Sequence, residues 1–262
     1  MLEICMLASG SSGNAIYIAA GETKLLIDAG LSGRRIANAL TAIGADAASL
    51  SALLLSHDHV DHTCGAGVMA RRYGLPVYAT APTWQAAGKA LGNIAPEQCR
   101  LLPNCGTITL GALTVETMPV PHDAADPVGF IVRSAKRAAA LVTDLGHVTP
   151  YILQRLQAVD CLVLEANHDE EMLLQGSYPW PLKKRILGAK GHLSNELAAE
   201  SLTKVINAQT KHVVLAHLSE ENNCPQLAYD TVCCRLERTG QLNQVTVQVA
   251  KRHQPSCHLR LA

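Results

Sequence analysis

Short apolar runs separated by turn residues dominate the first part of the chain. Such runs predict strands when Gly, Ser or Asn clusters bound them. Here the strands are expected over Leu2–Leu7, Ala15–Ala19, Lys24–Ile27 and Ser51–Leu55. A glycine- and serine-rich turn at Ser9–Asn14 follows the first of them, and Gly21 marks a hairpin turn.

Apolar residues at helical spacing alternate with further apolar runs along the rest of the chain. Helices are expected over Arg34–Ile43, Cys64–Tyr73, Pro82–Leu91, Pro150–Leu156, Ser194–Ile206 with Ser194 as N-cap, and Pro225–Leu236. Strands are expected over Pro76–Ala79, Ile108–Leu110, Leu113–Met118, Gly129–Arg133, Ala138–Val142, Cys161–Leu164, Val213–Ala216, Val245–Val249 and His258–Leu261. This order favours an α/β sandwich over a strict βαβ alternation.

Composition narrows the class of protein. The chain has 262 residues, of which 48% are hydrophobic and 17% charged, so it can bury a sizeable core and is not a disordered, highly charged chain. There is no low-complexity linker, and we expect a single domain over residues 1–262. The formal net charge of +0 gives no global attraction to nucleic acid or membrane.

No apolar run reaches the roughly 18 residues that a membrane-spanning helix needs, so no membrane association is expected. The N-terminal segment begins like a strand and does not resemble a secretion signal. The nine cysteines have no CxxC spacing. Most of them lie in apolar surroundings, where a small buried residue in a reducing compartment is expected. A cytoplasmic location is therefore expected.

The segment from His57 to His62, with the sequence HDHVDH, carries the strongest chemical signal. It places three imidazoles and two carboxylates within six residues, directly after an apolar strand. Imidazole nitrogen and carboxylate oxygen are ligands for zinc and similar ions. A tight turn here would let His57 and His59 face one ion, and Asp61 and His62 a second. Two ions about 3.5–4 Å apart can clamp a scissile group and generate hydroxide.

HDHVDH is an HxHxDH motif. Together with one motif before it and three after it, it makes the chain resemble the metallo-β-lactamase superfamily. LLIDAG supplies Asp28, PVPHDAADPVGF supplies His122, LVTDLG supplies Asp144 and VLAHLS supplies His217. The resemblance implies a four-layer αββα metallo-β-lactamase sandwich of the α/β class. It also implies that Asp28 braces the metal loop.

The same resemblance implies a site for two divalent ions, zinc or manganese, with iron as a further candidate. The first ion would be held by His57, His59 and His122, and the second by Asp61, His62 and His217, with Asp144 bridging. A hydroxide between the ions would be the nucleophile, because two cations lower the pKa of the water that they share.

Glu165 and His192 resemble the glutamate–histidine pair of ribonuclease Z-like phosphodiesterases. An imidazole oriented by a carboxylate can donate a proton to a leaving oxygen, so both are assigned catalytic roles together with Asp61. SGSSGN, EANHD, GHLSN and HLSEENN further resemble the YycJ/WalJ group. That resemblance implies a 5′→3′ exonuclease acting on DNA.

Substrate-binding candidates come from the same motifs: Ser11, Ser12, Asn14, His192, Ser194 and Asn222. The glycine-rich loop at 9–14 either presents backbone N–H groups to a phosphate or is an ordinary tight turn. The basic cluster at 183–190 either contacts a nucleic-acid backbone or is a solvated face. Trp180 is expected to be a packed loop anchor.

Two other functions remain open. The neutral net charge also suits a small-molecule hydrolase, such as a cyclic phosphodiesterase or a thioesterase of the glyoxalase II kind. A metal-stabilised scaffold protein without turnover is a third reading, which the complete ligand set disfavours. The sequence leaves open the metals, DNA against RNA, cleavage polarity and oligomeric state.

Overall fold

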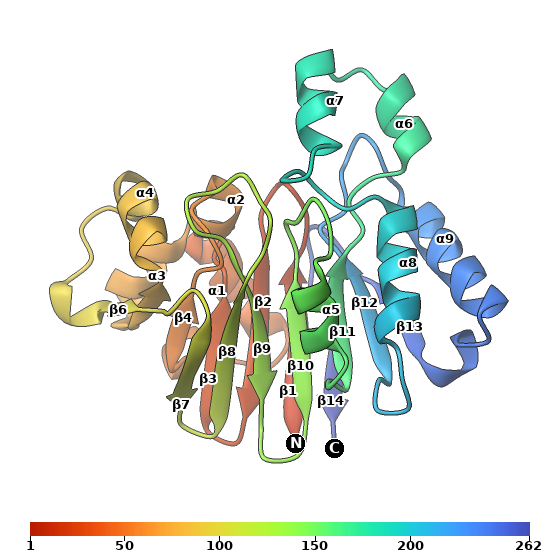
Figure 1. Ribbon diagram of the computed structural model, residues 1–262. Coiled ribbons are helices and arrows are strands. Elements are labelled where there is room, and N and C mark those ends of the chain that lie inside the picture. Colours follow the sequence, from red (N-terminus) through yellow and green to blue (C-terminus); the bar gives the residue numbers. More distant parts are fainter. The chain divides into compact units, whose positions relative to one another are not determined.

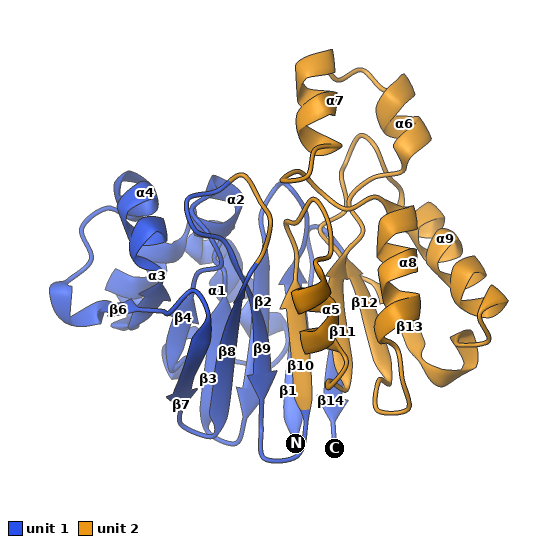
Figure 2. Cartoon of the chain, viewed as in Figure 1, with its two compact units in different colours: residues 1–119, 124–137, 251–262 blue, residues 120–123, 138–250 orange.

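The computed structural model describes residues 1–262, which form two compact units (Figure 2). Unit 1 comprises Met1–Pro119, Ala124–Arg137 and Lys251–Ala262, and unit 2 comprises Val120–Asp123 and Ala138–Ala250. Because unit 1 is assembled from three separate stretches of chain, no single cut in the sequence divides the two units.

A seven-stranded sheet lies within unit 1, in the order β14-β1-β2-β3-β4-β5-β6 (Figure 1). Its strands are β1 (Leu2–Ala8), β2 (Ala15–Ala20), β3 (Thr23–Ile27), β4 (Ala52–Leu54), β5 (Val77–Ala79), β6 (Cys99–Leu101) and β14 (Ser256–Leu261). The sheet is mixed: β14, β1, β2 and β3 pair antiparallel, whereas β3 to β6 pair parallel. Every residue of β4 is buried, as expected for a central parallel strand.

Unit 1 also contains an antiparallel meander of three strands: β7 (Gly106–Leu110), β8 (Leu113–Pro119) and β9 (Val128–Arg133). Gly111 closes the hairpin between β7 and β8 with a φ of 54°, a left-handed conformation that glycine adopts without steric cost. Chain order alone therefore explains this pairing, since each strand lies beside the next one along the sequence.

Unit 2 contains four parallel strands: β10 (Ala138–Val142), β11 (Cys161–Glu165), β12 (His212–Ala216) and β13 (Thr246–Val249). Val142 pairs with Leu164, and Glu165 pairs with Ala216. The carboxyl ends of β10, β11 and β12 therefore lie at one edge. Residues that follow these strands emerge there together, which is where open parallel sheets usually bind ligands.

Helices follow or connect these strands. Unit 1 contains α1 (Gly33–Ala42), α2 (Val60–Thr63), α3 (Ala66–Tyr73), α4 (Ala81–Leu91) and the 3₁₀ turns η1 (Ala47–Ser49) and η2 (Pro96–Gln98). Unit 2 contains α5 (Pro150–Leu156), α6 (Glu170–Gln175), α7 (Trp180–Ile186), α8 (Asn195–Val205), α9 (Pro225–Arg238) and η3 (Leu242–Gln244). Figure 1 shows α8 and α9 side by side, and α9 also contacts β13.

The predicted start signals account for several helix boundaries. Ser194 caps α8, because its side chain accepts a hydrogen bond from the Leu197 N–H group. Thr149 caps α5 in the same way, and Pro150 then occupies the first helical position, where the absence of an N–H group costs nothing. The expected boundaries of these helices are confirmed to within one or two residues.

Three short helices were not expected from the sequence. Helix α2 lies inside the HDHVDH motif, where a tight turn is predicted, and α6 and α7 lie in a segment that the pattern leaves unassigned. Their lengths of four, six and seven residues are too short to show a helical period. Packing and caps stabilise such helices, because isolated short helices are marginal in water.

The core of unit 1 is apolar and continuous. Buried residues from β1, β2, β3 and β4 pack with Ile36 and Leu40 of α1 and with Met69 and Ala70 of α3. Ile36 and Leu40 are four residues apart and so face the same side of their helix. This core lies beneath the loops that leave β3 and β4, which are the loops that carry Asp28 and the HDHVDH motif.

We predict that the chain unfolds as one cooperative domain. Trp84 lies in unit 1 and Trp180 in unit 2, so the variants Trp180→Phe and Trp84→Phe each retain a single reporter. Unfolding in urea is followed for each variant by fluorescence and by far-UV circular dichroism. Within each variant, the two signals should give the same midpoint and the same slope. Midpoints that differ between fluorescence and dichroism within one variant would show that the units unfold separately.

Candidate metal centre

The HDHVDH segment gathers three imidazoles and a carboxylate in unit 1. The ring centroid of His57 lies 4.7 Å from that of His59 and 4.1 Å from that of His62. His59 is the N-cap of α2, and the helix brings Asp61 Oδ2 to 3.6 Å from His62 Nε2. His57 and His62 are buried. These groups are nitrogen and oxygen donors of the kind that zinc and manganese bind.

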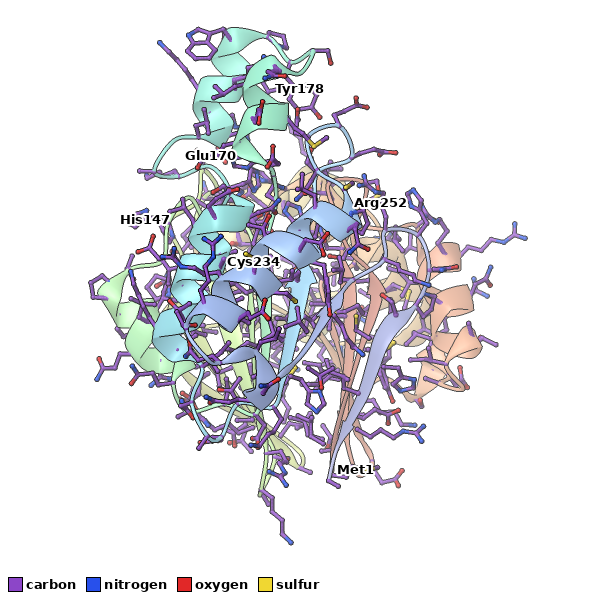
Figure 3. All side chains as sticks on the ribbon, turned by 90° about the vertical axis from the view of Figure 1, so that its right-hand side faces the viewer. Met1, His147, Glu170, Tyr178, Cys234 and Arg252 are labelled. Carbon is purple, nitrogen blue, oxygen red and sulfur yellow. The ribbon has the colours of Figure 1, made fainter.

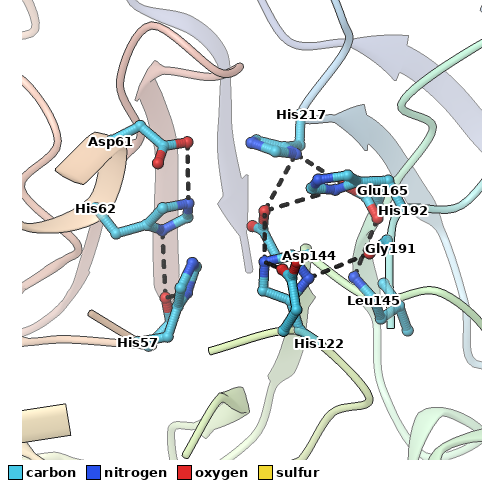
Figure 4. Close-up of polar contacts among 12 residues, drawn as sticks. His57, Asp61, His62, His122, Asp144, Leu145, Glu165, Gly191, His192 and His217 are labelled. Carbon is cyan, nitrogen blue, oxygen red and sulfur yellow. Dashed lines mark hydrogen bonds and ion pairs between the residues drawn. The ribbon is translucent and has the colours of Figure 1, made fainter. Parts of the chain in front are cut away.

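Asp28, the residue after β3, holds this segment in place (Figure 4 shows His62 and its neighbours). Its carboxylate accepts hydrogen bonds of 2.8 Å from Ser56 N, Ser56 Oγ and His62 Nδ1. A carboxylate can only accept, so His62 carries its proton on Nδ1. This leaves Nε2 as the nitrogen of His62 that is available to a metal. The bracing role expected for Asp28 agrees with these contacts.

Ser56 determines which ring nitrogen of His57 carries the proton. Its hydroxyl donates its one proton to Asp28, so at 2.9 Å from His57 Nδ1 it acts as an acceptor. His57 is then protonated on Nδ1, which leaves Nε2 available to a metal. Ser56 was not among the residues predicted from the sequence, although its place immediately before the motif is a signal that could have found it.

Close backbone packing fixes the segment further. Asn14 N donates to Asp61 O and Gly30 N donates to Asn14 O, each at 2.8 Å, while Ala29 N donates to His62 O at 2.8 Å. A Cβ atom at Gly30 would lie 1.6 Å from Asp61 O, so only glycine fits there. The turn at 10–14, the loop after β3 and the HDHVDH segment therefore form one hydrogen-bonded assembly.

In unit 2, four candidate ligand side chains meet at the edge where the parallel strands end. Asp144, Glu165, His192 and His217 each offer one donor atom, and these atoms lie within 4.8 Å of one another. His217 Nδ1 is 3.4 Å from Asp144 Oδ1, and His192 Nδ1 is 3.7 Å from it (Figure 4). The expected grouping of residues after successive strands is thus present within this unit.

Glu165 holds two of these imidazoles. Its Oε1 accepts from His217 Nδ1 at 2.7 Å and from His192 Nδ1 at 2.8 Å. Its Oε2 accepts from the backbone N–H groups of Leu145 at 3.1 Å and Leu193 at 3.0 Å. The His192 contact agrees with the predicted pair. The bond to His217 was not predicted, because a sequence motif does not show that one carboxylate serves two rings.

The protonation of this cluster follows from burial and charge. Burial of Glu165 favours its neutral acid, but the positive charges and hydrogen bonds of His192 and His217 outweigh it and lower the pKa of Glu165 to about 2. Burial likewise favours a neutral His192, yet Glu165 and then Asp144 overcome it and raise the pKa of His192. The His192 side chain is 20% exposed whereas Glu165 is fully buried, so the imidazole is the member that can reach a substrate.

His122 is fixed by a backbone carbonyl. Its Nδ1 lies 3.1 Å from Gly191 O, which can only accept, so Nε2 is again the nitrogen available to a metal. That Nε2 lies 3.9 Å from Asp144 Oδ1 and 3.5 Å from Asp123 Oδ1. Asp123 in turn forms an ion pair with Arg185 of α7. Within each unit the donor atoms are therefore of the kind that can hold a divalent metal. The rings of His57, His62, His122 and His217 each have a partner at Nδ1, which leaves Nε2 available.

The backbone is strained at these residues. Only four non-glycine residues have a left-handed φ, and three of them carry site side chains: Asp28 (60°), Asp144 (60°) and His217 (56°). Each such residue costs roughly 1–3 kcal/mol and persists where its surroundings over-determine it. Each also closely follows a strand, so the sharp turn aims the side chain across the edge of the sheet.

The other substrate-binding candidates lie in varied surroundings. Ser11 and Ser12 are exposed in the turn at 10–13, whereas Asn14 is buried with its Nδ2 3.0 Å from His62 Nε2. Ser194 is buried as the cap of α8, and Asn222 is buried in the loop after β12, where its Nδ2 lies 3.4 Å from Ser219 Oγ. Substrate contacts from these residues stay predictions.

His168 is a buried group that the sequence did not place. It is 1% exposed, and neither of its ring nitrogens has a hydrogen-bond partner. Burial lowers its pKa to about 4, because the charged imidazolium loses its hydration there. The ring is therefore neutral in the folded protein at neutral pH.

The sequence matches a known family over most of its length. Residues 23–218 match the beta-lactamase superfamily domain. The chain belongs to this superfamily, as expected from its motifs.

Two proteins with similar sequences have names that state an enzymatic activity. The chain is 42% identical over 239 residues to exodeoxyribonuclease YycJ of Bacillus anthracis, covering 91% of this chain and 90% of that protein. It is also 42% identical over 233 residues to exodeoxyribonuclease WalJ of Streptococcus pneumoniae strain D39, covering 88% of this chain and 87% of that one. The expectation of an enzyme, a metal-dependent hydrolase, is confirmed by this kinship.

Solved structures with low sequence identity share the fold. The metallo-β-lactamase fold protein YhfI of Bacillus subtilis matches with a TM-score of 0.73 and 14% identity, covering 98% of this chain and 99% of that one. Zn²⁺-bound PqqB of Methylobacterium extorquens matches with a TM-score of 0.69 and 18% identity, covering all of both chains. The expected fold class, an α/β metallo-β-lactamase sandwich, is confirmed.

None of the helices combines the length and the apolar run that crossing a bilayer requires.

We predict that His168 makes stability fall in acid. Its folded pKa of about 4 is below the ordinary 6.5, so between these pH values the unfolded chain binds a proton that the folded chain does not. Stability is therefore fully present above about pH 6.5 and is lost as the pH falls toward 4. We subtract the free energy of unfolding of His168→Leu from that of the wild type. This difference should fall by about 3 kcal/mol as the pH is lowered from 6.5 to 4.

Urea titrations at several pH values measure this difference. His168→Gln serves as a second variant that keeps a polar side chain but does not titrate. A difference that stays constant with pH in both variants would contradict the prediction.

Proposed function

We propose that this protein is a metal-dependent nuclease, and specifically an exonuclease that removes nucleotides from the 5′ end of DNA. The observation that carries the proposal is the pairing of His192 with Glu165 beside Asp144 and His217. An imidazole that a carboxylate orients in this way can protonate the leaving oxygen of a phosphodiester. The 42% identity to two exodeoxyribonucleases over almost the whole chain supports DNA as the substrate.

We further propose two divalent ions, zinc or manganese. His57, His59 and His122 would hold one, Asp61, His62 and His217 would hold the other, and Asp144 would bridge them. This combined assignment rests on the order of the motifs in the sequence. Partners at Nδ1 of four of the five imidazoles, those of all but His59, support it. When bound, such ions lower the pKa of a water molecule toward neutrality and neutralise charge on phosphate oxygens.

The protein's own groups have separate tasks in this proposal. His192, charged and held by Glu165, gives a proton from Nε2 to the leaving oxygen of the DNA strand. Glu165 stays ionised, because it keeps the Nδ1–H bonds of both rings throughout. Asp61 and Asp144 supply negative charge that balances the cations. Only two of the nine cysteines are buried, so the expectation that most of them are small buried residues is wrong. All nine are free thiols, which suit a reducing compartment, so we propose a cytosolic location.

We predict that His192→Ala lowers turnover on duplex DNA by about 10²- to 10⁴-fold, the usual contribution of a general acid, without loss of metal. The assay follows cleavage of 5′-labelled and 3′-labelled duplexes by metal-stripped protein resupplied with Mn²⁺ or Zn²⁺. Asp61→Ala should lose both metal and activity, and His147→Ala, an exposed histidine, is the matched control.

Release of nucleotides from the 5′ end by the wild type, abolished in the two site variants, is the expected result. If His192→Ala loses its metal, the role given to His192 is wrong. If the wild type cleaves neither duplex DNA, single strands nor RNA with either metal, the nuclease proposal fails and a small-molecule substrate replaces it.

We predict that Asp28→Asn lowers metal affinity about 10- to 100-fold, because the neutral amide has one acceptor oxygen where the carboxylate uses two, and it holds the Nδ1 proton of His62 more weakly. Asparagine tolerates the left-handed φ at this position, so the backbone is preserved. Competition with a chromophoric chelator measures the affinity, with the exposed Asp230→Asn as control. Unchanged affinity in Asp28→Asn would contradict the bracing role.

A further inference from the structure

Helices α6 and α7 form a hairpin that projects from unit 2 beyond the carboxyl ends of its parallel strands (Figure 1). We call residues 169–192 the α6–α7 hairpin. Figure 3 labels Glu170 and Tyr178 within it and shows that it stands away from α8 and α9. It begins four residues after Glu165 and ends at His192, so both of its ends adjoin the candidate catalytic pair.

The base of the hairpin is firmly attached. His168 and Ser194 form a parallel β-bridge, and Asn167 N donates to Leu193 O at 2.8 Å. Asp169 N donates to Asn222 O at 2.9 Å. These backbone bonds give the hairpin a defined position on unit 2.

Helix α7 is also attached to the site residues. His192 N donates to Ile186 O at 2.9 Å, and Arg185 forms its ion pair with Asp123, the neighbour of His122. A Cβ atom at Gly191 would lie 2.1 Å from Ile186 O, so the chain passes very close to the end of α7. A ligand held by α7 is therefore held at a fixed place relative to His192.

The second half of the hairpin carries local positive charge although the chain as a whole is neutral. Residues 176–192 contain four Lys or Arg residues and no acidic residue, whereas residues 169–171 are all acidic. Lys183 is buried, and its Nζ donates to Leu174 O and Gly176 O, each at 2.7 Å. It therefore stabilises the hairpin, and it neither faces solvent nor is free to contact a nucleic-acid backbone. Lys184 and Lys190 are exposed and face solvent.

Trp180 is the most unusual residue of the hairpin. It is the first residue of α7 and is 56% exposed, so the expectation that it is a packed loop anchor is wrong. The Nζ atom of Lys184 lies 5.9 Å from the centroid of its ring. An exposed indole beside a lysine offers a flat apolar surface and a positive charge to the same ligand.

We propose that Trp180 and Lys184 form a binding platform for the terminal base of a DNA strand, with the indole stacking on the base and the ammonium group facing its phosphate. This inference rests on the proposed nuclease function. Inside a duplex each base is already stacked on both faces, and only an end exposes one. An aromatic platform fixed relative to His192 therefore selects ends, and stacking is tolerant of base identity.

The first experiment compares two activities of the same holoenzyme. One is cleavage of a blunt duplex, and the other is hydrolysis of bis(p-nitrophenyl) phosphate, which has no base to stack. Trp180→Ala should lower the ratio of duplex kcat/KM to that of the small diester about tenfold, the usual effect of removing one stacked base. Trp180→Tyr should restore most of it, and Lys184→Gln should lower it through KM.

Lys211→Gln is the matched control, because Lys211 is exposed and precedes β12 at the opposite end of the strand from His217. A merely structural role for Trp180 would lower both activities together and leave the ratio unchanged. An unchanged ratio in Trp180→Ala overturns the platform.

The second experiment does not depend on cleavage. The chain has two tryptophans, so Trp84→Phe leaves Trp180 as the only one. A blunt duplex with phosphorothioate ends should quench its fluorescence, whereas a circular duplex at equal base-pair concentration should not. Equal quenching by both, or no quenching at a concentration where anisotropy shows saturation, overturns the proposal.

The two proposals fail in different ways. Quenching by duplex ends without cleavage by the wild type would support the platform and reject the nuclease. Cleavage by the wild type with no effect of Trp180 on ratio or fluorescence would keep the nuclease and reject the platform.

Discussion

The structure depends on buried carboxylates that each accept the Nδ1 proton of an imidazole. Asp28 holds His62 in unit 1, and Glu165 holds His217 and His192 in unit 2. Because a carboxylate cannot donate, each of these rings keeps a proton on Nδ1 and one orientation before any ligand arrives. The loops, caps and close backbone approaches around them keep the carboxylates where this restriction is possible. Groups that are held in place in this way need no reorganisation at the moment of reaction.

Strand ends and strained backbone act together to produce that geometry. The parallel strands of unit 2 deliver Asp144, Glu165 and His217 to one edge, and left-handed turns at Asp144 and His217 aim the side chains. The hydrogen bonds of the loops offset the local strain. The strained conformations thus lie where the site needs side chains in fixed positions, which is common at active sites.

Much of this could be predicted from the sequence, because the residues that matter follow apolar strands in short motifs. The strands, the cap at Ser194, the brace Asp28 and the pair of Glu165 with His192 were all accessible in this way. The double use of Glu165 was not, since it requires the register of β11 against β12. Helices α6 and α7 were missed because they are too short for a period, and the exposure of Trp180 depends on a hairpin whose shape no local pattern encodes.

The shared oxygen of Glu165 has a consequence for how such an enzyme can change. His192 and His217 hang from the same atom, at 2.8 and 2.7 Å. Any substitution that repositions one ring to suit a new leaving group also moves the other. Evolution or design that seeks a new substrate must therefore leave this anchor intact and vary residues farther out. The projecting hairpin, whose tip lies outside the shared hydrogen bonds, is the part of the molecule with that freedom.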